Sequence, residues 1–155
     1  MWEYEYSVDT AATPAAVWSH WSDMPAWPAW NAGIEKIEID GPFEVGTTFT
    51  MTPPGDDPVT MRLTEIVPGE LFTDEMDAGD FVVRTVHSLT PVTPGSVTPG
   101  SVTPGSVTSG TRITYRTEIT GPAADQIGPE LGPAITADFP DVLAALAKVA
   151  LDHAA

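Results

Sequence analysis

The first residues of the chain alternate between apolar and polar side chains, which is the period-two pattern of a β-strand with one side facing solvent. The apolar positions are Trp2, Tyr4, Tyr6 and Val8, and the polar positions between them are Glu3, Glu5, Ser7 and Asp9. This pattern predicts a strand at the start of the sequence.

Helical spacing replaces the alternation after Thr13. Thr13 is a good N-cap, and Pro14 suits the first position of a helix. The apolar stripe that follows is Val17, Trp18 and Trp21. We predict a helix of about two turns here. Residues 23–31 hold two prolines and two tryptophans and allow a second short helix.

Between Gly33 and Thr120, glycine and proline turn signals separate stretches of alternating apolar residues. Short connections of this kind predict an antiparallel meander, because a parallel sheet would need crossover helices. The predicted strands are residues 34–40, 45–52, 58–67, 70–77, 80–90 and 111–120.

The C-terminal segment has the pattern of one long amphipathic helix. Pro140 either lies in the first turn, with Asp138 as the N-cap, or kinks the helix, and the sequence leaves both alternatives open. The apolar face consists of Ile135, Phe139, Val142, Leu143, Leu146 and Val149.

Residues 92–110 read VTPGS three times and then VTSG. The repeat is too short and too polar for a solenoid, and loops tolerate insertions at little free-energy cost. We therefore predict an expanded hairpin loop at about 91–110 with no role in the core.

Composition limits the class of protein. A chain of 155 residues can bury one core, so we predict a single domain over residues 1–155. There are 22 acidic and 6 basic residues, a net charge of −16, which repels phosphate backbones and anionic lipid heads. We expect no nucleic-acid partner. A solvated acidic surface is the simplest interpretation of the charge, and a site for a basic partner is the alternative.

The chain contains no cysteine, which excludes disulfides, thiolate metal sites and a thiol nucleophile. The sequence begins with acidic residues where a signal peptide needs basic ones, and no window reaches the roughly 18 apolar residues of a membrane span. We expect a cytoplasmic monomer or homodimer without membrane insertion.

Several short sequence segments and the order of the predicted elements resemble those of the START-like or Bet v 1-like superfamily, the SRPBCC proteins of polyketide cyclase/dehydrase and lipid transport. The segments are Thr13 to Trp18, Trp27 to Asn31, Thr64 to Glu70, Gly110 to Tyr115, and Leu143 to Leu151. The resemblance covers nearly the whole chain except the repeat. It implies an α+β helix-grip fold, in which a curved antiparallel seven-stranded sheet wraps around a long C-terminal helix and two short helices follow the first strand.

In that superfamily a cavity between sheet and helix holds a sterol, polyketide, lipid or aromatic ligand. The resemblance implies a mostly apolar cavity here, with His87 and Tyr115 as its polar groups. The implied lining is Trp27, Trp30, Phe49, Met51, Met61, Leu63, Phe81, Val83, His87, Tyr115, Phe139, Val142 and Leu146.

His87 and Tyr115 are the candidate catalytic residues. His87 is in phase with Phe81, Val83 and Leu89, so we expect its ring to face the interior, where it could exchange a proton. The alternative is a structural histidine, because the sequence identifies no acidic partner. Tyr115 likewise either points its hydroxyl into the cavity or is a core tyrosine with its hydroxyl hydrogen-bonded.

Aromatic and arginine residues allow further interpretations. Four tryptophans could stack on a flat ligand or could pack the short helices onto the sheet. Arg62 and Arg84 are out of phase with the apolar faces, which predicts solvent-facing positions paired with acids. The tryptophans are Trp18, Trp21, Trp27 and Trp30.

The acidic stretch from Asp74 to Asp80 lacks the oxygen spacing of an EF-hand, and we interpret it as a solvated turn. The histidines are far apart and lack metal-ligand spacing. Walker, GxGxxG and GxSxG motifs do not occur in the sequence. We expect neither a metal nor a cofactor.

Three hypotheses of function follow. The leading one is a binding module that carries an apolar, aromatic, polyketide or lipid-like molecule in its cavity. The second is a cofactor-free enzyme of the cyclase, aromatase or dehydratase kind that uses the same cavity. The third is a protein-interaction domain that acts through its acidic surface.

Overall fold

The computed structural model describes residues 1–92 and 110–152. Seven strands form one antiparallel sheet in the order β1-β7-β6-β5-β4-β3-β2, so the predicted meander is confirmed. The strands are β1 (Trp2–Thr10), β2 (Lys36–Ile39), β3 (Thr48–Thr52), β4 (Val59–Val67), β5 (Leu71–Asp77), β6 (Val82–Val92) and β7 (Gly110–Thr120).

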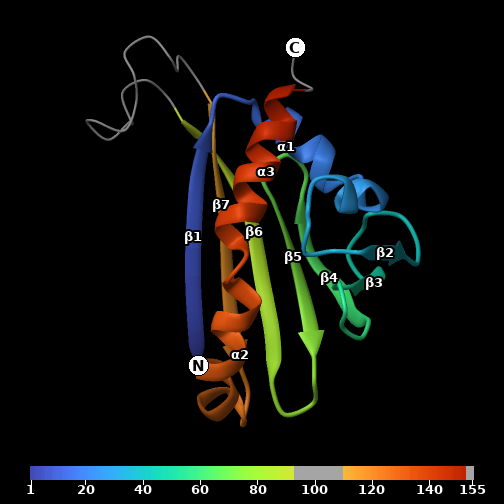
Figure 1. The fold of residues 1–155 in the computed structure, drawn as a ribbon, viewed down its shortest axis with the longest axis vertical. Helices are drawn as coiled ribbons and strands as arrows, with labels where there is room; N and C mark the ends of the chain where they lie inside the picture. Colours follow the sequence, from blue (N-terminus) through green and yellow to red (C-terminus); the bar gives the residue numbers. More distant parts are fainter. Residues whose placement is uncertain (93–109, 153–155) are drawn as a thin grey trace.

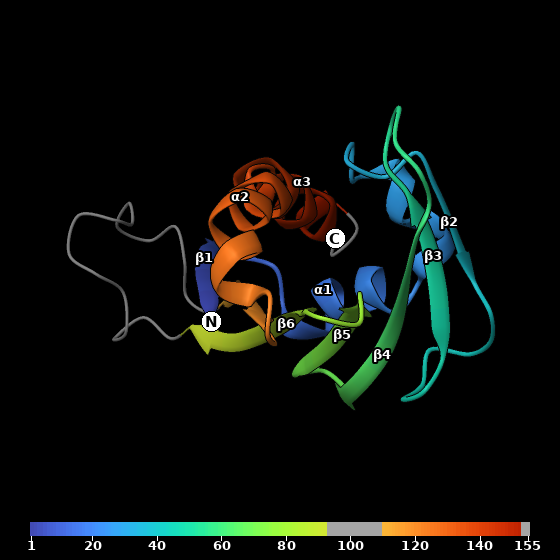
Figure 2. The ribbon, with the colours of Figure 1, turned by 90° about the horizontal axis from the view of Figure 1, so that it is seen from below.

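The sheet curves strongly, and helices lie on its concave side (Figures 1 and 2). In Figure 2 the strands curl from β1 around to β2, and α2 and α3 lie inside the curve. The helices are α1 (Pro14–Trp21), the 3-10 helix η1 (Met24–Ala29), α2 (Ala124–Thr136) and α3 (Phe139–Asp152). This arrangement is the predicted helix-grip fold.

The first helix begins where the sequence predicts it. The Thr13 side chain accepts a hydrogen bond from the backbone N–H of Ala16 at 3.2 Å, and Pro14 occupies the first helical position. Val17 and Trp21 of this helix are fully buried. The N-cap and the apolar stripe therefore anchor α1 to the core.

Two helical segments form the C-terminal helix, with a bend between them. Pro140 lies in the first turn of α3, where its missing N–H costs no helical hydrogen bond. The N–H of Val142 donates to the carbonyl of Asp138 at 2.9 Å, which closes that first turn. Pro140 therefore lies in a first turn, as one alternative has it, and the C-terminal helix as a whole is bent just before it, as the other has it.

The segment α2 was not predicted, because Pro129 and Pro133 lie inside it. It packs against β1 through two glycines. A methyl group added at Gly128 would lie 2.5 Å from Cβ of Trp2, and one at Gly132 would overlap the Trp2 indole. Close packing on Trp2 therefore stabilises a helix that its own composition disfavours.

The first predicted positions of strand 45–52 are wrong. Val45 is 61% exposed, and β3 begins only at Thr48. Gly46 intervenes with a φ of +95°, a conformation that breaks the alternation.

The ends of β6 and β7 pair through Val92 and Gly110. The predicted hairpin loop at about 91–110 therefore joins two paired strands, but the repeat itself, residues 93–109, lies outside the described residues. Within the described part of the chain, no helix is long and apolar enough to cross a membrane.

Candidate functional site

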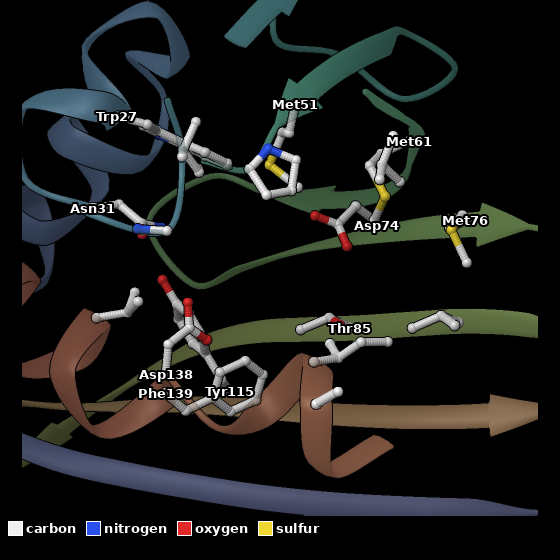
Figure 3. A pocket seen from close by; sticks show the side chains of 18 of the residues that line it. Trp27, Asn31, Met51, Met61, Asp74, Met76, Thr85, Tyr115, Asp138 and Phe139 are labelled. Carbon is white, nitrogen blue, oxygen red and sulfur yellow. The ribbon is translucent and has the colours of Figure 1, made fainter. Parts of the chain in front are cut away.

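A cavity of about 520 Å³ lies between the concave face of the sheet and the two C-terminal helices. Figure 3 shows side chains from η1, the strands and the helix α3 pointing into it. Its volume lies within the range of small-molecule sites in proteins. The lining consists of Trp27, Trp30, Asn31, Gly33, Ile34, Met51, Pro53, Asp56, Asp57, Val59, Met61, Asp74, Met76, Val83, Thr85, His87, Tyr115, Leu131, Ala134, Ile135, Asp138, Phe139 and Val142.

Most of the predicted lining residues border this cavity. They are Trp27, Trp30, Met51, Met61, Val83, His87, Tyr115, Phe139 and Val142. Four others do not. Phe49, Leu63 and Leu146 are fully buried in the hydrophobic core, and Phe81 packs beside Val83 in a second cluster. Alternation identifies the inner face, but it does not distinguish a residue that borders a cavity from one that fills the core.

Strand register places two rows of side chains on the inner face of the sheet, and four of their members, Asp74, Thr85, His87 and Tyr115, border the cavity. In one row Phe72, His87 and Tyr115 are direct neighbours on β5, β6 and β7. In the adjacent row Asp74 is opposite Thr85, which is opposite Thr117. The first row is aromatic and the second is polar, so aromatic rings lie next to hydrogen-bonding side chains on β5, β6 and β7.

Asp74 is the acidic member of the polar row. Its side chain is 5% exposed, and its carboxyl points into the cavity (Figure 3). Burial raises the pKa of Asp74 from 3.8 to about 8, and the charge of Glu75 adds to this shift. Asp74 therefore carries a proton at neutral pH in the unliganded protein.

The interpretation of Asp74 as part of a solvated turn is wrong. Residues 71–77 form β5, and the turn begins only after Asp77. Asp74 is in phase with Phe72 and Met76, both of which face the interior. This alternation was the signal in the sequence that could have identified Asp74 as a cavity residue.

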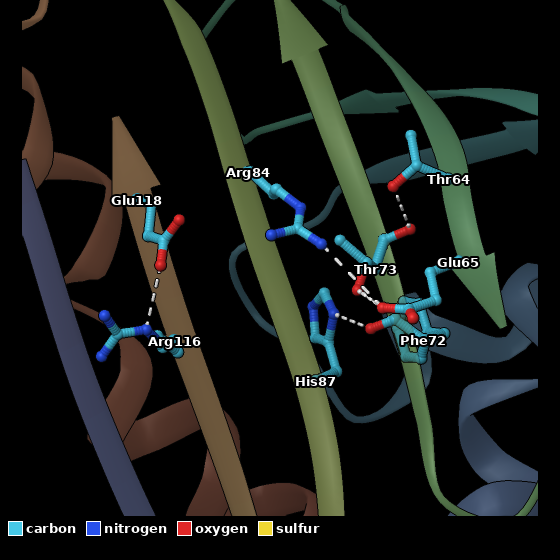
Figure 4. Close-up of polar contacts among 8 residues, drawn as sticks. All are labelled: Thr64, Glu65, Phe72, Thr73, Arg84, His87, Arg116 and Glu118. Carbon is cyan, nitrogen blue, oxygen red and sulfur yellow. Dashed lines mark hydrogen bonds and ion pairs between the residues drawn. The ribbon is translucent and has the colours of Figure 1, made fainter. Parts of the chain in front are cut away.

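His87 lies on the neighbouring strand. Its Nδ1 is 3.2 Å from the carbonyl oxygen of Phe72, so Nδ1–H donates and Nε2 keeps a lone pair (Figure 4). That Nε2 lies 4.0 Å from Oδ2 of Asp74. Burial lowers the pKa of His87 from 6.5 to about 3, against the opposing effect of the Phe72 hydrogen bond. Asp74 and His87 are therefore a neutral pair at pH 7.

Tyr115 adds a hydroxyl to this cluster. The indole N–H of Trp21 donates to the Tyr115 oxygen at 3.2 Å. Burial raises the pKa of Tyr115, so its hydroxyl stays protonated. Because Trp21 uses the oxygen as an acceptor, the Tyr115 proton is available to donate into the cavity.

The four tryptophans divide between the two roles that the sequence allows. Trp27 and Trp30 border the cavity. Trp18 and Trp21 do not, and they pack edge-to-face with each other. Trp21 also packs against Phe72 at a centroid distance of 5.2 Å.

The two arginines are also placed by the structure. Arg62 is exposed. Arg84 lies on the outer side of β6, 3.9 Å from Glu65 (Figure 4).

Among the described residues, no group of three or more His, Cys, Asp or Glu side chains is arranged to hold a metal ion.

The family model described as "Polyketide cyclase / dehydrase and lipid transport" matches residues 1–151. The chain belongs to this family. No curated protein matches the sequence. The description names both enzymes and lipid transport, so the family supports hydrophobic-ligand binding or cyclase-like roles only in general terms.

Solved structures share this fold. Norcoclaurine synthase from Thalictrum flavum, in complex with dopamine and hydroxybenzaldehyde, has a TM-score of 0.69 at 18% identity and covers 99% of this chain and 88% of its own. Protein XoxI from Bacillus cereus has a TM-score of 0.70 at 15% identity over 98% and 97%. Ara h 8.0201 has a TM-score of 0.67 at 14% identity over 97% and 98%. At these identities the likeness shows the fold alone.

Proposed function

We propose that the protein binds and carries one apolar small molecule in the cavity between its sheet and its C-terminal helices. The observation that supports this most is a cavity of about 520 Å³ with a largely apolar lining and a few buried polar groups at one place on its floor. A filled core would leave no such space.

Burial of the ligand would supply most of the affinity. At about 25 cal/mol per Å², a ligand that buries roughly 200 Å² of apolar surface gains about 5 kcal/mol before the costs of association. Met51, Met61 and Met76 border the cavity and adapt easily to different shapes. A neighbour of the same fold is solved with dopamine and hydroxybenzaldehyde, which supports a small aromatic ligand here.

Thermal unfolding against a panel of sterols, fatty acids, flavonoids, aromatic polyketides and aromatic amines tests the proposal. A ligand at about 100 times its Kd stabilises the native state by about 2.7 kcal/mol, which raises Tm by roughly 5–10 °C for a chain of this size.

A matched pair of variants on α2 shows whether a hit binds in the cavity. Ile135 borders the cavity, and Glu130 is exposed and does not. Ile135→Trp should fill the cavity and abolish the Tm shift, and Glu130→Trp should keep it. An equal shift in both variants, or no shift with any compound, contradicts the proposal.

The neutral pair of Asp74 and His87 favours a second function, cofactor-free proton transfer of the cyclase or dehydratase kind. Asp74, with a pKa of about 8, can exchange a proton near neutral pH, while Nε2 of His87 can accept a hydrogen bond from a ligand and the Tyr115 hydroxyl can donate one to a ligand carbonyl. Turnover of an aromatic polyketide precursor should fall at least about 100-fold in the double variant His87→Ala, Tyr115→Phe. Full turnover in that variant excludes this function.

A further inference from the structure

The cavity lining contains acids but no basic side chain. Asp74 lies on its floor, and Asp56, Asp57 and Asp138 are exposed lining residues at its rim. The six lysines and arginines of the chain all lie in the described part, and none of them borders the cavity. His87 is neutral, so it adds no positive charge. The potential inside the cavity is therefore negative and favours a cation over an anion.

Asp74 has no hydrogen-bond partner in the described part of the protein. Its nearest polar contact is Nε2 of His87 at 4.0 Å, which is longer than a hydrogen bond. A buried carboxyl group without a partner costs free energy, and buried charges in proteins are paired. Since the carboxyl points into the cavity (Figure 3), the missing partner can come from a ligand.

The walls near Asp74 also suit a cation. Trp27 and Tyr115 present aromatic rings, which attract cations, and Met51 and Met61 present polarizable sulfur. A fatty acid or another carboxylate would meet like charge at the rim and would find no cationic side chain in the lining.

We propose that the ligand is a lipophilic amine, with an apolar body in the cavity and one ammonium group that donates a hydrogen bond to the Asp74 carboxylate. This inference rests on the proposed function and names its ligand class. The acids at the rim would draw the ammonium toward the cavity, and Asp74 would hold it inside.

The affinity for an amine should depend on pH, because binding must displace the proton of Asp74. Asp74 is protonated below about pH 8, so an ammonium ligand must displace that proton. Affinity therefore rises with pH through this range, until the ligand amine itself deprotonates near about pH 10. The titratable groups that face Asp74 are His87 on β6 and Tyr115 on β7, with Asp138 across the cavity (Figure 3), whereas Glu75 is on the outer side of the sheet, opposite Arg84. Burial keeps His87 neutral and Tyr115 protonated between pH 7 and 9, so neither reverses the sign of the pH dependence.

The test is calorimetric titration with three naphthalene probes, naphthylethylamine, naphthylethanol and naphthylacetate, near pH 6.5 and near pH 8.5. At the higher pH the amine should bind about tenfold more tightly than the alcohol, and the acetate should bind most weakly. The amine affinity should rise on the order of tenfold between the two pH values. The alcohol affinity should stay constant or fall.

Two variants complete the test. Asp74→Asn keeps the shape and removes the charge, so it should weaken the amine about tenfold and abolish the pH dependence, with the alcohol within about twofold of wild type. Glu44→Gln removes one exposed acid that does not border the cavity, and it should change none of these values.

The outcomes separate the two proposals. If the alcohol binds to the wild-type protein as tightly as the amine at both pH values, the amine inference is overturned and the binding function stands. If Asp74→Asn keeps full amine affinity, the inference is likewise overturned. If no probe binds, the proposed function and the inference fail together.

Discussion

Oδ2 of Asp74 lies 4.0 Å from Nε2 of His87, and burial leaves both groups uncharged at neutral pH. The two residues come from adjacent strands and from adjacent rows on the floor of the cavity. They therefore form a small polar group in a largely apolar cavity. Because folding shifts both pKa values, the free energy of unfolding depends on pH.

Stability should fall as the pH rises from 6.5 to 8. The pKa of Asp74 is raised from 3.8 to about 8 on folding, so the native state binds more protons than the unfolded state over that range, and stability falls with pH. Between about pH 3 and 6.5, His87 has the opposite effect, because its pKa is lowered on folding. In that range the two effects on stability cancel. We expect a net decrease of about 1–1.5 kcal/mol in the free energy of unfolding between pH 6.5 and 8. Urea unfolding at a series of pH values measures it.

Asp74→Asn should remove this decrease. The variant cannot ionise, so above pH 8 it should be more stable than wild type by roughly 2–4 kcal/mol. Glu44→Gln is the control, because it changes the net charge by the same amount at an exposed position. A wild-type curve that stays flat from pH 6.5 to 8 would show that Asp74 is already ionised.

His87→Phe should make the protein gain stability as the pH falls from 6.5 to about 4, because the opposing effect of His87 on the Asp74 contribution is removed. The His87 ring stacks on Phe72 at a centroid distance of 4.0 Å, and phenylalanine can keep that packing. The variant loses the hydrogen bond to the Phe72 carbonyl, which should cost about 1 kcal/mol at pH 7. Near pH 4 it should be the more stable protein, because in wild type the protonation of unfolded histidine offsets the stability that protonated Asp74 contributes. Acid titration of the circular dichroism signal compares the two proteins, and identical acid transitions would contradict the prediction.

Trp21 and Tyr115 should be energetically coupled. Tyr115→Phe leaves the buried indole N–H of Trp21 without its acceptor, which should cost about 1–3 kcal/mol. In a Trp21→Phe background the same change should cost less than about 1 kcal/mol. A double-mutant cycle by chemical denaturation measures the difference, and strictly additive effects would mean that the hydrogen bond contributes nothing.

Gly132→Ala should destabilise the protein, although alanine normally favours a helix. The added methyl group overlaps the Trp2 indole, and we expect a loss of about 1–3 kcal/mol. In a Trp2→Ala background the space is free, and the same substitution should instead stabilise by up to about 1 kcal/mol. Thermal unfolding of the four proteins provides the comparison; a stabilising effect with Trp2 present would contradict the close packing of α2 on β1.

The sequence predicted most of the fold because local signals and long-range packing agree in most elements. Thr13 and Pro14 mark the start of α1, and the turn signals between 33 and 120 separate the strands of the meander. The segment α2 escaped prediction because its prolines and glycines oppose a helix locally, and the contact with Trp2 that stabilises it spans the length of the chain.

The site was only partly predictable for a different reason. Alternation placed His87 and Tyr115 on the inner face, and both border the cavity. The same alternation includes Asp74 between Phe72 and Met76, but the acidic run that follows it suggested a solvated turn. The identity of the core residues Phe49, Leu63 and Leu146 depends on how α3 and η1 fit against the sheet, which no periodic pattern encodes.

Fluorescence titration with the neutral apolar probe N-phenylnaphthylamine tests most directly whether the cavity takes a ligand. We predict saturable binding of one probe per chain, retained in Glu130→Trp and lost in Ile135→Trp. Absence of saturable binding to the wild-type protein, or equal binding to both variants, would contradict the proposed function.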